Sequence, residues 1–154
     1  MKRLIALDTN ILLYDIQPPS PSEPPHVAAW RKDIQALLAR PDLRFAIPAP
    51  ALGEFLSHFG AQTFDEVAEH YEGHFETIPY NSAAARWASR LFHQQAHSGL
   101  DPDTRARRKT DLEILACALA ANAFGLCTTH PALLDLPHGH RLLVSLPEDF
   151  VSLT

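Results

Sequence analysis

Short apolar runs alternate with longer helical segments along nearly the whole chain, and this alternation limits the folds that the sequence can adopt. The runs lie at residues 4–7, 45–47, 77–79, 126–129 and 142–146; the longer segments lie at residues 26–40, 49–59, 64–74 and 81–97 and in a last helix ending at Gly125. Strands that alternate with helices predict an α/β fold, with a central parallel sheet covered by helices on both faces. A chain of 154 residues, 46% of them hydrophobic, can bury one substantial core, so we expect a single domain over residues 1–154.

Turn and cap signals set the expected boundaries between these elements. Residues 17–25 read QPPSPSEPP, and this proline content excludes a helix interior and predicts a surface loop. Thr63, with Glu66 three residues later, is typical of a capping box that opens the next helix. Residues 98–104 are polar and predict a loop, and Gly125 is expected to close the helix that follows it.

The charge balance restricts the partners of the chain. Asp and Glu number 18 against 13 Lys and Arg, so a nucleic-acid partner would depend on a local basic patch and not on the overall charge. The sequence reaches an acid after the short apolar run at residues 4–7, and it has no apolar run of about 18 residues. We therefore expect a cytoplasmic protein that has no membrane partner.

Two acidic residues occupy positions where a carboxylate has a special role. Asp8 follows the first strand directly, and in an open parallel sheet the functional crevice lies beyond the carboxyl ends of the strands. Asp111 shares one helix face with Ile114, Leu115 and Ala118, so its carboxylate is expected at the edge of the core. The same periodicity predicts that Glu113 points to solvent.

Carboxylates that meet at the edge of a core need a compensating charge, because two of them about 4 Å apart repel by roughly 4 kcal/mol at an intermediate dielectric. A bound Mg²⁺ or Mn²⁺ ion removes that repulsion and promotes phosphodiester hydrolysis. Each acid also has an ordinary structural interpretation. Asp8 can cap a helix, Glu54 can be a solvated helix residue, and Asp111 can pair with Lys109 or Arg108.

Taken together and in order, four motifs resemble those of the PIN-domain nucleases, and most closely the VapC-type toxins of toxin-antitoxin pairs. The motifs are LDTNILLY at residues 7–14, PALGEFL at residues 50–56, KTDLEILA at residues 109–116 and LCTT at residues 126–129. They span nearly the whole chain. The resemblance implies a PIN-like α/β/α sandwich with a central parallel sheet, and Mg²⁺- or Mn²⁺-dependent cleavage of RNA phosphodiester bonds. It also implies a cognate antitoxin protein and suggests a homodimer.

The same resemblance assigns site residues in this sequence. Asp8, Glu54 and Asp111 would be the catalytic and metal-binding acids, and Asn10 would orient Asp8 or a water molecule in the site, although it can instead bond its own backbone.

The last motif departs from the family pattern. The family commonly has Asn-Asp after the threonine of the last motif, whereas this chain has Thr129-His130 and no acid before Asp135. His130 can bind Mn²⁺, contact phosphate or be a loop residue without a role; Asp135 can reach in from its loop; or the three acids can suffice with Thr128.

A cluster of basic residues precedes Asp111. Arg105, Arg107, Arg108 and Lys109 would form an RNA-binding strip beside the acids, and this local patch answers the objection from net charge. The alternative is a solvated first helical turn. Positive charge near a helix N-terminus is mildly unfavourable, which favours another purpose for these residues.

Two other functions compete with the nuclease hypothesis. A phosphatase of the haloacid-dehalogenase type would use Asp8 as a covalent nucleophile, but such enzymes usually carry a second aspartate where this chain has Asn10. A catalytically impaired PIN-like module would bind RNA or protein without turnover, a hypothesis motivated by the missing fourth acid.

Overall fold

The computed structural model describes residues 1–95, 98–136 and 138–154, and its centre is a five-stranded sheet in which every pair of neighbours is parallel. The strands are β1 (Arg3–Leu7), β2 (Leu43–Pro48), β3 (Glu76–Ile78), β4 (Gly125–Cys127) and β5 (Leu143–Ser145). All five occupy segments that the sequence predicted as strands. The prediction of an α/β fold with a central parallel sheet is confirmed.

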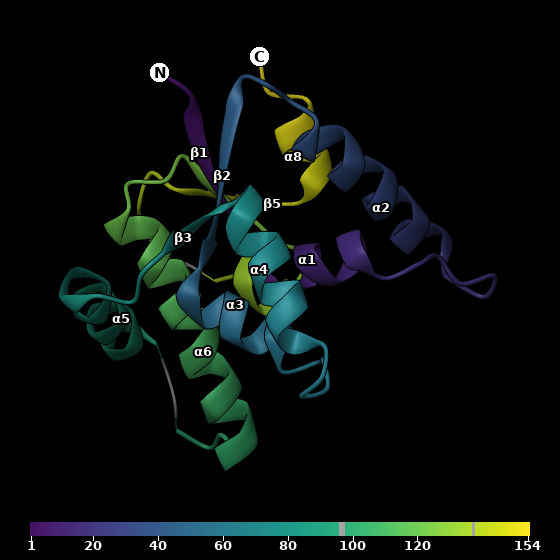
Figure 1. Ribbon diagram of the computed structural model, residues 1–154. Coiled ribbons are helices and arrows are strands. Elements are labelled where there is room, and N and C mark those ends of the chain that lie inside the picture. Colours follow the sequence, from purple (N-terminus) through teal and green to yellow (C-terminus); the bar gives the residue numbers. More distant parts are fainter. Residues whose placement is uncertain (96–97, 137) are drawn as a thin grey trace.

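Helices lie on both sides of this sheet (Figure 1). They are α1 (Thr9–Ile16), α2 (Pro25–Leu38), α3 (Ala49–Leu56), α4 (Phe64–His74), α5 (Ser82–Gln94), α6 (Pro102–Ala120), α7 (Pro131–Leu134) and α8 (Pro147–Val151). Helix α2 packs on α1 and α8, whereas α6 packs on α5 and α7. Figure 1 shows α2 and α8 on one side of the strands and α5 and α6 on the other.

The strand order β3-β2-β1-β4-β5 reverses direction at β1. The chain adds β2 and then β3 on one side of β1 and afterwards returns to add β4 and β5 on the other side. Ile5 of β1 therefore pairs with Phe45 of β2 and with Gly125 of β4. The crevice beyond the carboxyl ends of β1 and β4 is the topological switch point, the place where open α/β sheets bind ligands.

The predicted end of the last long helix was wrong by several residues. Helix α6 ends at Ala120, and Asn122 adopts φ 52° as the left-handed residue that closes it. The Ala123 amide donates to the Ala118 carbonyl at 3.0 Å, a bond that characterises the Schellman motif. Gly125 instead opens β4, where a Cβ atom would lie 2.3 Å from a ring carbon of Phe150. This glycine is required by close packing and not by the end of a helix.

Three further expectations about local structure need correction. The capping box at Thr63 is absent, because the Thr63 hydroxyl donates to the Gly60 carbonyl at 3.2 Å and caps no amide of α4. Helix α6 begins at Pro102, inside the predicted loop, because the Asp101 side chain caps it through the Thr104 amide. Helix α5 ends at Gln94, and residues 96 and 97 of the expected helix lie outside the described residues.

The loop before α2 is surface-exposed as predicted, and an arginine fixes it to the body of the protein. Arg31 of α2 pairs with Glu23 at 2.7 Å and donates to the backbone carbonyls of Tyr14 and Gln17, each at 2.6 Å. These bonds fasten both ends of the proline-rich segment. Among the described helices, none is long and apolar enough to cross a membrane.

Candidate active site

Asp8 lies where β1 ends and α1 begins, at the switch point of the sheet. The residue is only 3% exposed, and both carboxylate oxygens accept hydrogen bonds. Oδ1 accepts from the Thr9 amide at 2.8 Å, so Asp8 caps α1, and Oδ2 accepts from the Thr128 hydroxyl at 2.6 Å. The helix-cap interpretation is therefore correct, and it leaves the carboxylate facing the crevice that the topology creates.

Thr128 connects the two strands that border this crevice. It is fully buried and directly follows β4, and its hydroxyl oxygen both donates to Asp8 and accepts from the His130 amide at 3.0 Å. One side chain therefore fixes the orientation of the Asp8 carboxylate and the conformation of the loop that carries His130.

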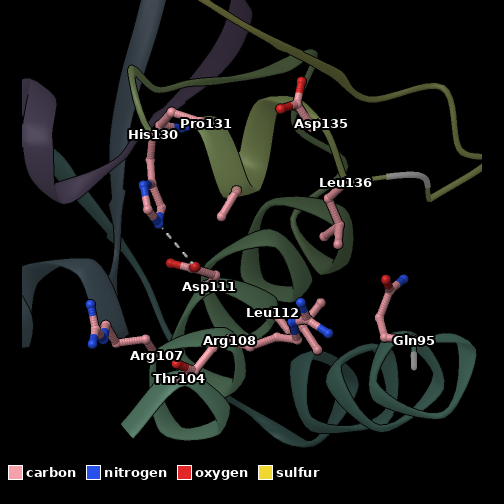
Figure 2. Close-up of a pocket in the computed structure, with 11 residues that line it drawn as sticks. Gln95, Thr104, Arg107, Arg108, Asp111, Leu112, His130, Pro131, Asp135 and Leu136 are labelled. Atoms are coloured by element: carbon pink, nitrogen blue, oxygen red, sulfur yellow. Dashed lines mark hydrogen bonds and ion pairs between the residues drawn. The ribbon is translucent and has the colours of Figure 1, made fainter. Parts of the chain in front are cut away.

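Asp111 extends from α6 toward the same crevice, and its partner is His130 (Figure 2). The Nε2 atom of His130 lies 3.2 Å from Oδ2 of Asp111, and the side chains are 39% and 15% exposed respectively. Among the described residues, Asp111 makes no ion pair with Lys109 or Arg108, so that structural interpretation of Asp111 was wrong. The helix face that the sequence predicted is correct, since Ile114, Leu115 and Ala118 are all buried.

Burial raises the pKa of both aspartates. The pKa of Asp8 lies above its ordinary value of 3.8, chiefly because the carboxylate is buried and also because Glu54 is near, while the bonds from Thr128 and Thr9 oppose the shift. Burial raises the pKa of Asp111 to about 6, with the charges of Asp8 and Glu54 adding to the rise and His130 opposing it. Asp8, Glu54 and Asp111 therefore repel one another electrostatically, which a cation would relieve.

Glu54 is exposed on α3, and it lines the same cavity as the two aspartates. This cavity, which we call the acid cavity, has a volume of about 290 Å³. Its lining residues are Asp8, Thr9, Asn10, Leu13, Glu54, His58, Arg107, Asp111 and His130. Three acids that lie far apart in the sequence thus face one space from three different elements.

Asn10 also lines the acid cavity, as do three residues that the sequence analysis did not single out, namely Thr9, Leu13 and His58. Among the described residues, the side-chain amide of Asn10 makes no hydrogen bond to Asp8. His58 lies four residues after Glu54, just beyond the end of α3, a spacing that could have revealed it, and its Nδ1 atom lies 3.0 Å from the Glu54 carbonyl oxygen. Thr9 is buried, and its hydroxyl donates to the Ala51 carbonyl at 3.3 Å, which ties α1 to α3.

A second and larger cavity, of about 470 Å³, adjoins the first and shares Arg107, Asp111 and His130 with it. Arg108 and Asp135 line this cavity as well. Figure 2 shows the Asp135 carboxylate directed away from Asp111, whereas His130 points directly at it. Asp135 thus lies on the rim of the larger cavity and outside the acid cavity.

The four basic residues before Asp111 separate around α6. Arg107 lines both cavities, and Arg108 lines only the larger one. Lys109 faces α5 and lines another cavity with Tyr80 and Glu113, while Arg105 is exposed and lines none of these three cavities. The expectation that Glu113 points to solvent was wrong, because α5 packs on that side of α6 and leaves Glu113 half-buried.

The donor chemistry of the acid cavity fits a hard divalent cation. Among the described residues, no three histidine, cysteine or acidic side chains are gathered closely enough to hold a metal ion as they stand. Mg²⁺ does not need such a cage, since it commonly binds through one or two carboxylates and keeps several waters. Asp8 and Asp111, with Glu54 at the edge, provide carboxylates of that kind beside an open space.

Comparison with known proteins gave matches among solved structures only. No protein-family model matches the chain, and no curated protein matches it. One match is a chain from the crystal structure of VapBC2 from Rickettsia felis, bound to a DNA fragment from its promoter. That chain is 20% identical to this one with a TM-score of 0.61, and the match covers 93% of this chain and 98% of that one.

Two further structures match over similar lengths. A toxin-antitoxin complex from Klebsiella pneumoniae is 20% identical with a TM-score of 0.59 and covers 93% of this chain and 97% of its own. DNA-bound VapBC from Salmonella typhimurium is 18% identical with a TM-score of 0.57 and covers 96% and 99%.

The chain has the fold of these toxin-antitoxin proteins. The resemblance that the sequence indicated is confirmed at the level of the fold, over nearly the whole chain.

Proposed function

We propose that this protein is a metal-dependent endoribonuclease and the toxin of a toxin-antitoxin pair, hydrolysing RNA phosphodiester bonds with a cation bound by Asp8, Glu54 and Asp111. The observation that carries the proposal is the meeting of these acids in one cavity at the switch point of the sheet. The electrostatic conflict among them gives a cation a reason to bind there.

Each acid has a distinct part in this proposal. Asp8 is held rigidly by the Thr9 amide and the Thr128 hydroxyl, so it presents a fixed carboxylate to the cation. Asp111 and Glu54 reach the same cavity from α6 and α3 and would complete a Mg²⁺ or Mn²⁺ site. A bound cation supplies charge neutralisation at the phosphate and activation of water for hydrolysis.

Positive groups beside the acids would hold the RNA backbone. Arg107 lines both cavities, and its guanidinium group suits bidentate contact with a phosphate. Arg108 extends the positive surface into the larger cavity. Arg105 and Lys109, farther from the acids, would contact RNA outside the reacting phosphate. His130 and Asp135 are auxiliary, and the His130 imidazole, which lines both cavities, would be suited to contact phosphate.

The partners of the protein follow from the same proposal. Two of the matching structures are VapBC proteins bound to DNA and one is a toxin-antitoxin complex, which supports a cognate antitoxin for this chain as well. We also propose, from the resemblance in sequence alone, that the protein forms a homodimer and acts on RNA in the cytoplasm.

Cleavage of a mixed RNA pool by the purified protein tests the proposed activity. We expect Mg²⁺-dependent cleavage that EDTA abolishes and that Asp111→Asn and Glu54→Gln each reduce strongly. Glu69→Gln is the matched control, because Glu69 is an exposed helical acid that lines neither the acid cavity nor the larger cavity. Equal cleavage by all variants would trace the activity to a contaminating nuclease.

One observation favours the second candidate, a PIN-like module that binds RNA or protein without turnover. His130 already pairs with Asp111 where the family commonly has an acid, and no described group of three ligands stands ready for a metal. Calorimetric titration with Mn²⁺ separates the two candidates. The nuclease requires Mn²⁺ binding that Asp8→Asn weakens, whereas a protein without any divalent-ion affinity is the module.

The phosphatase hypothesis receives less support. Both oxygens of Asp8 accept hydrogen bonds, from the Thr9 amide and the Thr128 hydroxyl, and such bonds weaken a carboxylate as a nucleophile toward phosphorus. Asn10 also leaves the position of the usual second aspartate without an acid.

A further inference from the structure

We propose that the larger cavity beside Asp111 is a subsite for one unpaired nucleobase, next to the phosphate that is cleaved. This inference rests on the proposed function and names the part of the substrate that the protein recognises. The cavity volume of about 470 Å³ lies in the range of small-molecule sites, about 300 to 1,000 Å³.

The position of the larger cavity links it to the reaction. Arg107, Asp111 and His130 line both this cavity and the acid cavity, so a ligand in one adjoins a ligand in the other. A nucleotide whose phosphate lies at the acids and Arg107 can therefore place its base in the larger cavity.

The lining of the cavity suits the two kinds of surface that a nucleobase presents. Apolar groups, namely Leu112, Pro131, Ala132 and Leu136, can contact the faces of the ring, while Gln95, Thr104 and Arg108 can contact its polar edge. Figure 2 shows Leu136 and Gln95 approaching this space from the loop after α7 and from just beyond the end of α5. Base faces that contact apolar or guanidinium groups and edges that meet polar groups are the usual features of single-stranded RNA recognition.

The base must be unpaired to occupy this position. A base inside a duplex is stacked and paired, and it enters a protein cavity only after it leaves the helix. The subsite therefore favours RNA loops and single strands over duplexes.

The charges favour a nucleotide over an acidic peptide. The larger cavity contains two carboxylates, those of Asp111 and Asp135, beside its two arginines. A nucleotide concentrates its charge at the phosphate, which can lie at Arg107, and brings an uncharged base against the rest of the lining. An acidic peptide would bring carboxylates toward both aspartates.

Nucleotide binding to the intact chain tests the subsite without any need for cleavage. The probes are the four ribonucleoside 5′-monophosphates, ribose 5-phosphate and a tetraglutamate peptide, titrated by NMR. We expect at least one nucleotide to bind about fivefold or more tightly than ribose 5-phosphate, since a base stacked on a protein side chain contributes at least roughly that factor. The proposal would be overturned if ribose 5-phosphate or the peptide bound as tightly as every nucleotide. It would also be overturned if no nucleotide bound.

Two substitutions locate the binding in the cavity. Ala132→Trp fills it from an exposed position on α7, and Leu136→Trp fills it from the following loop, so a folding defect in one leaves the other informative. Ala29→Trp, on the exposed face of α2, is the control with the same added bulk. We expect both filling variants, and not the control, to lose the preference for nucleotides over ribose 5-phosphate. Retention of that preference in both would place the base elsewhere and contradict the proposal.

Cleavage of a randomised RNA pool separates failure of the subsite from failure of the proposed function. Sequencing of the cut ends should reveal a base preference at one position beside the cut that Ala132→Trp removes and Ala29→Trp retains. Cleavage without such a preference would refute the subsite and leave the nuclease. Nucleotide binding without metal-dependent cleavage would refute the nuclease and leave a base-binding cavity.

Discussion

Asp111→Asn is expected to make the metal-free protein more stable at neutral pH, although it removes a proposed catalytic acid. Burial and the charges of Asp8 and Glu54 raise the pKa of Asp111 from 3.8 to about 6. The folded protein therefore binds this proton more tightly than the unfolded chain does, and the stability of the wild type falls as pH rises from about 4 to about 6. Two pKa units correspond to about 3 kcal/mol, which solvent screening of this partly exposed group reduces to about 1 to 3 kcal/mol.

Urea unfolding of both proteins between pH 4 and pH 8 in EDTA measures this difference. The two proteins should have similar free energies of unfolding near pH 4, and the variant should be more stable above pH 6. Mg²⁺ should then stabilise the wild type, by about 2.7 kcal/mol at a hundred times its dissociation constant, and should stabilise the variant far less. A variant that is less stable than the wild type at pH 7 in EDTA, or a difference that does not change with pH, would refute this reasoning.

Two further predictions concern the packing around the acids and the sheet. Thr128→Val removes the hydrogen-bond donor to Asp8 and should cost about 1.5 to 3 kcal/mol of stability and weaken Mn²⁺ binding by about tenfold or more. Thr128→Ser keeps the hydroxyl group and should retain both the stability and the Mn²⁺ affinity. Urea unfolding measures the first effect and calorimetry the second, and an unchanged Mn²⁺ affinity in Thr128→Val would contradict the positioning role. Gly125→Ala should destabilise the protein by about 1 to 3 kcal/mol, because the new methyl group meets the Phe150 ring. Adding Phe150→Leu to this variant should partly restore its stability in thermal unfolding. A Gly125→Ala variant as stable as the wild type would show that the ring moves aside at no cost.

Most of the sheet was predictable because its strands are short and apolar. The run that ends on Asp8 identified β1 and placed its acid at the carboxyl end, and the alternation with helices then required a parallel sheet. The strand order was not predicted, since each strand is compatible with several neighbours. The reversal at β1, which creates the crevice, emerges only from the pairing of β1 with both β2 and β4.

The ends of elements were predicted less well, because the groups that close them are not specified by residue type alone. Gly125 is a residue type typical of helix ends, yet Asn122 ends α6 and the glycine is needed where Phe150 packs against β4. Thr63 stands at the correct N-cap position, but its hydroxyl turns to the Gly60 carbonyl. In both cases a tertiary or backbone contact outweighed the local signal.

Within the candidate site, the sequence identified the acids but not their partners. The periodicity of α6 placed Asp111 beside the core, as the structure has it. The pair between His130 and Asp111 joins residues on different elements, and the bond from Thr128 to Asp8 spans most of the chain. Such contacts depend on how the loop after β4 folds over the sheet, which no local pattern encodes.

The central claim is that Asp8, Glu54 and Asp111 form one metal site that cleaves RNA. Its most direct test is the rate at which the purified protein cuts a labelled single-stranded RNA in Mg²⁺, compared with the rate for Asp8→Asn under the same conditions. We predict cleavage by the wild type that depends on Mg²⁺ and is lost in Asp8→Asn while the variant stays folded. Undiminished cleavage by the folded Asp8→Asn variant, or a wild-type rate unaffected by EDTA, would contradict the account.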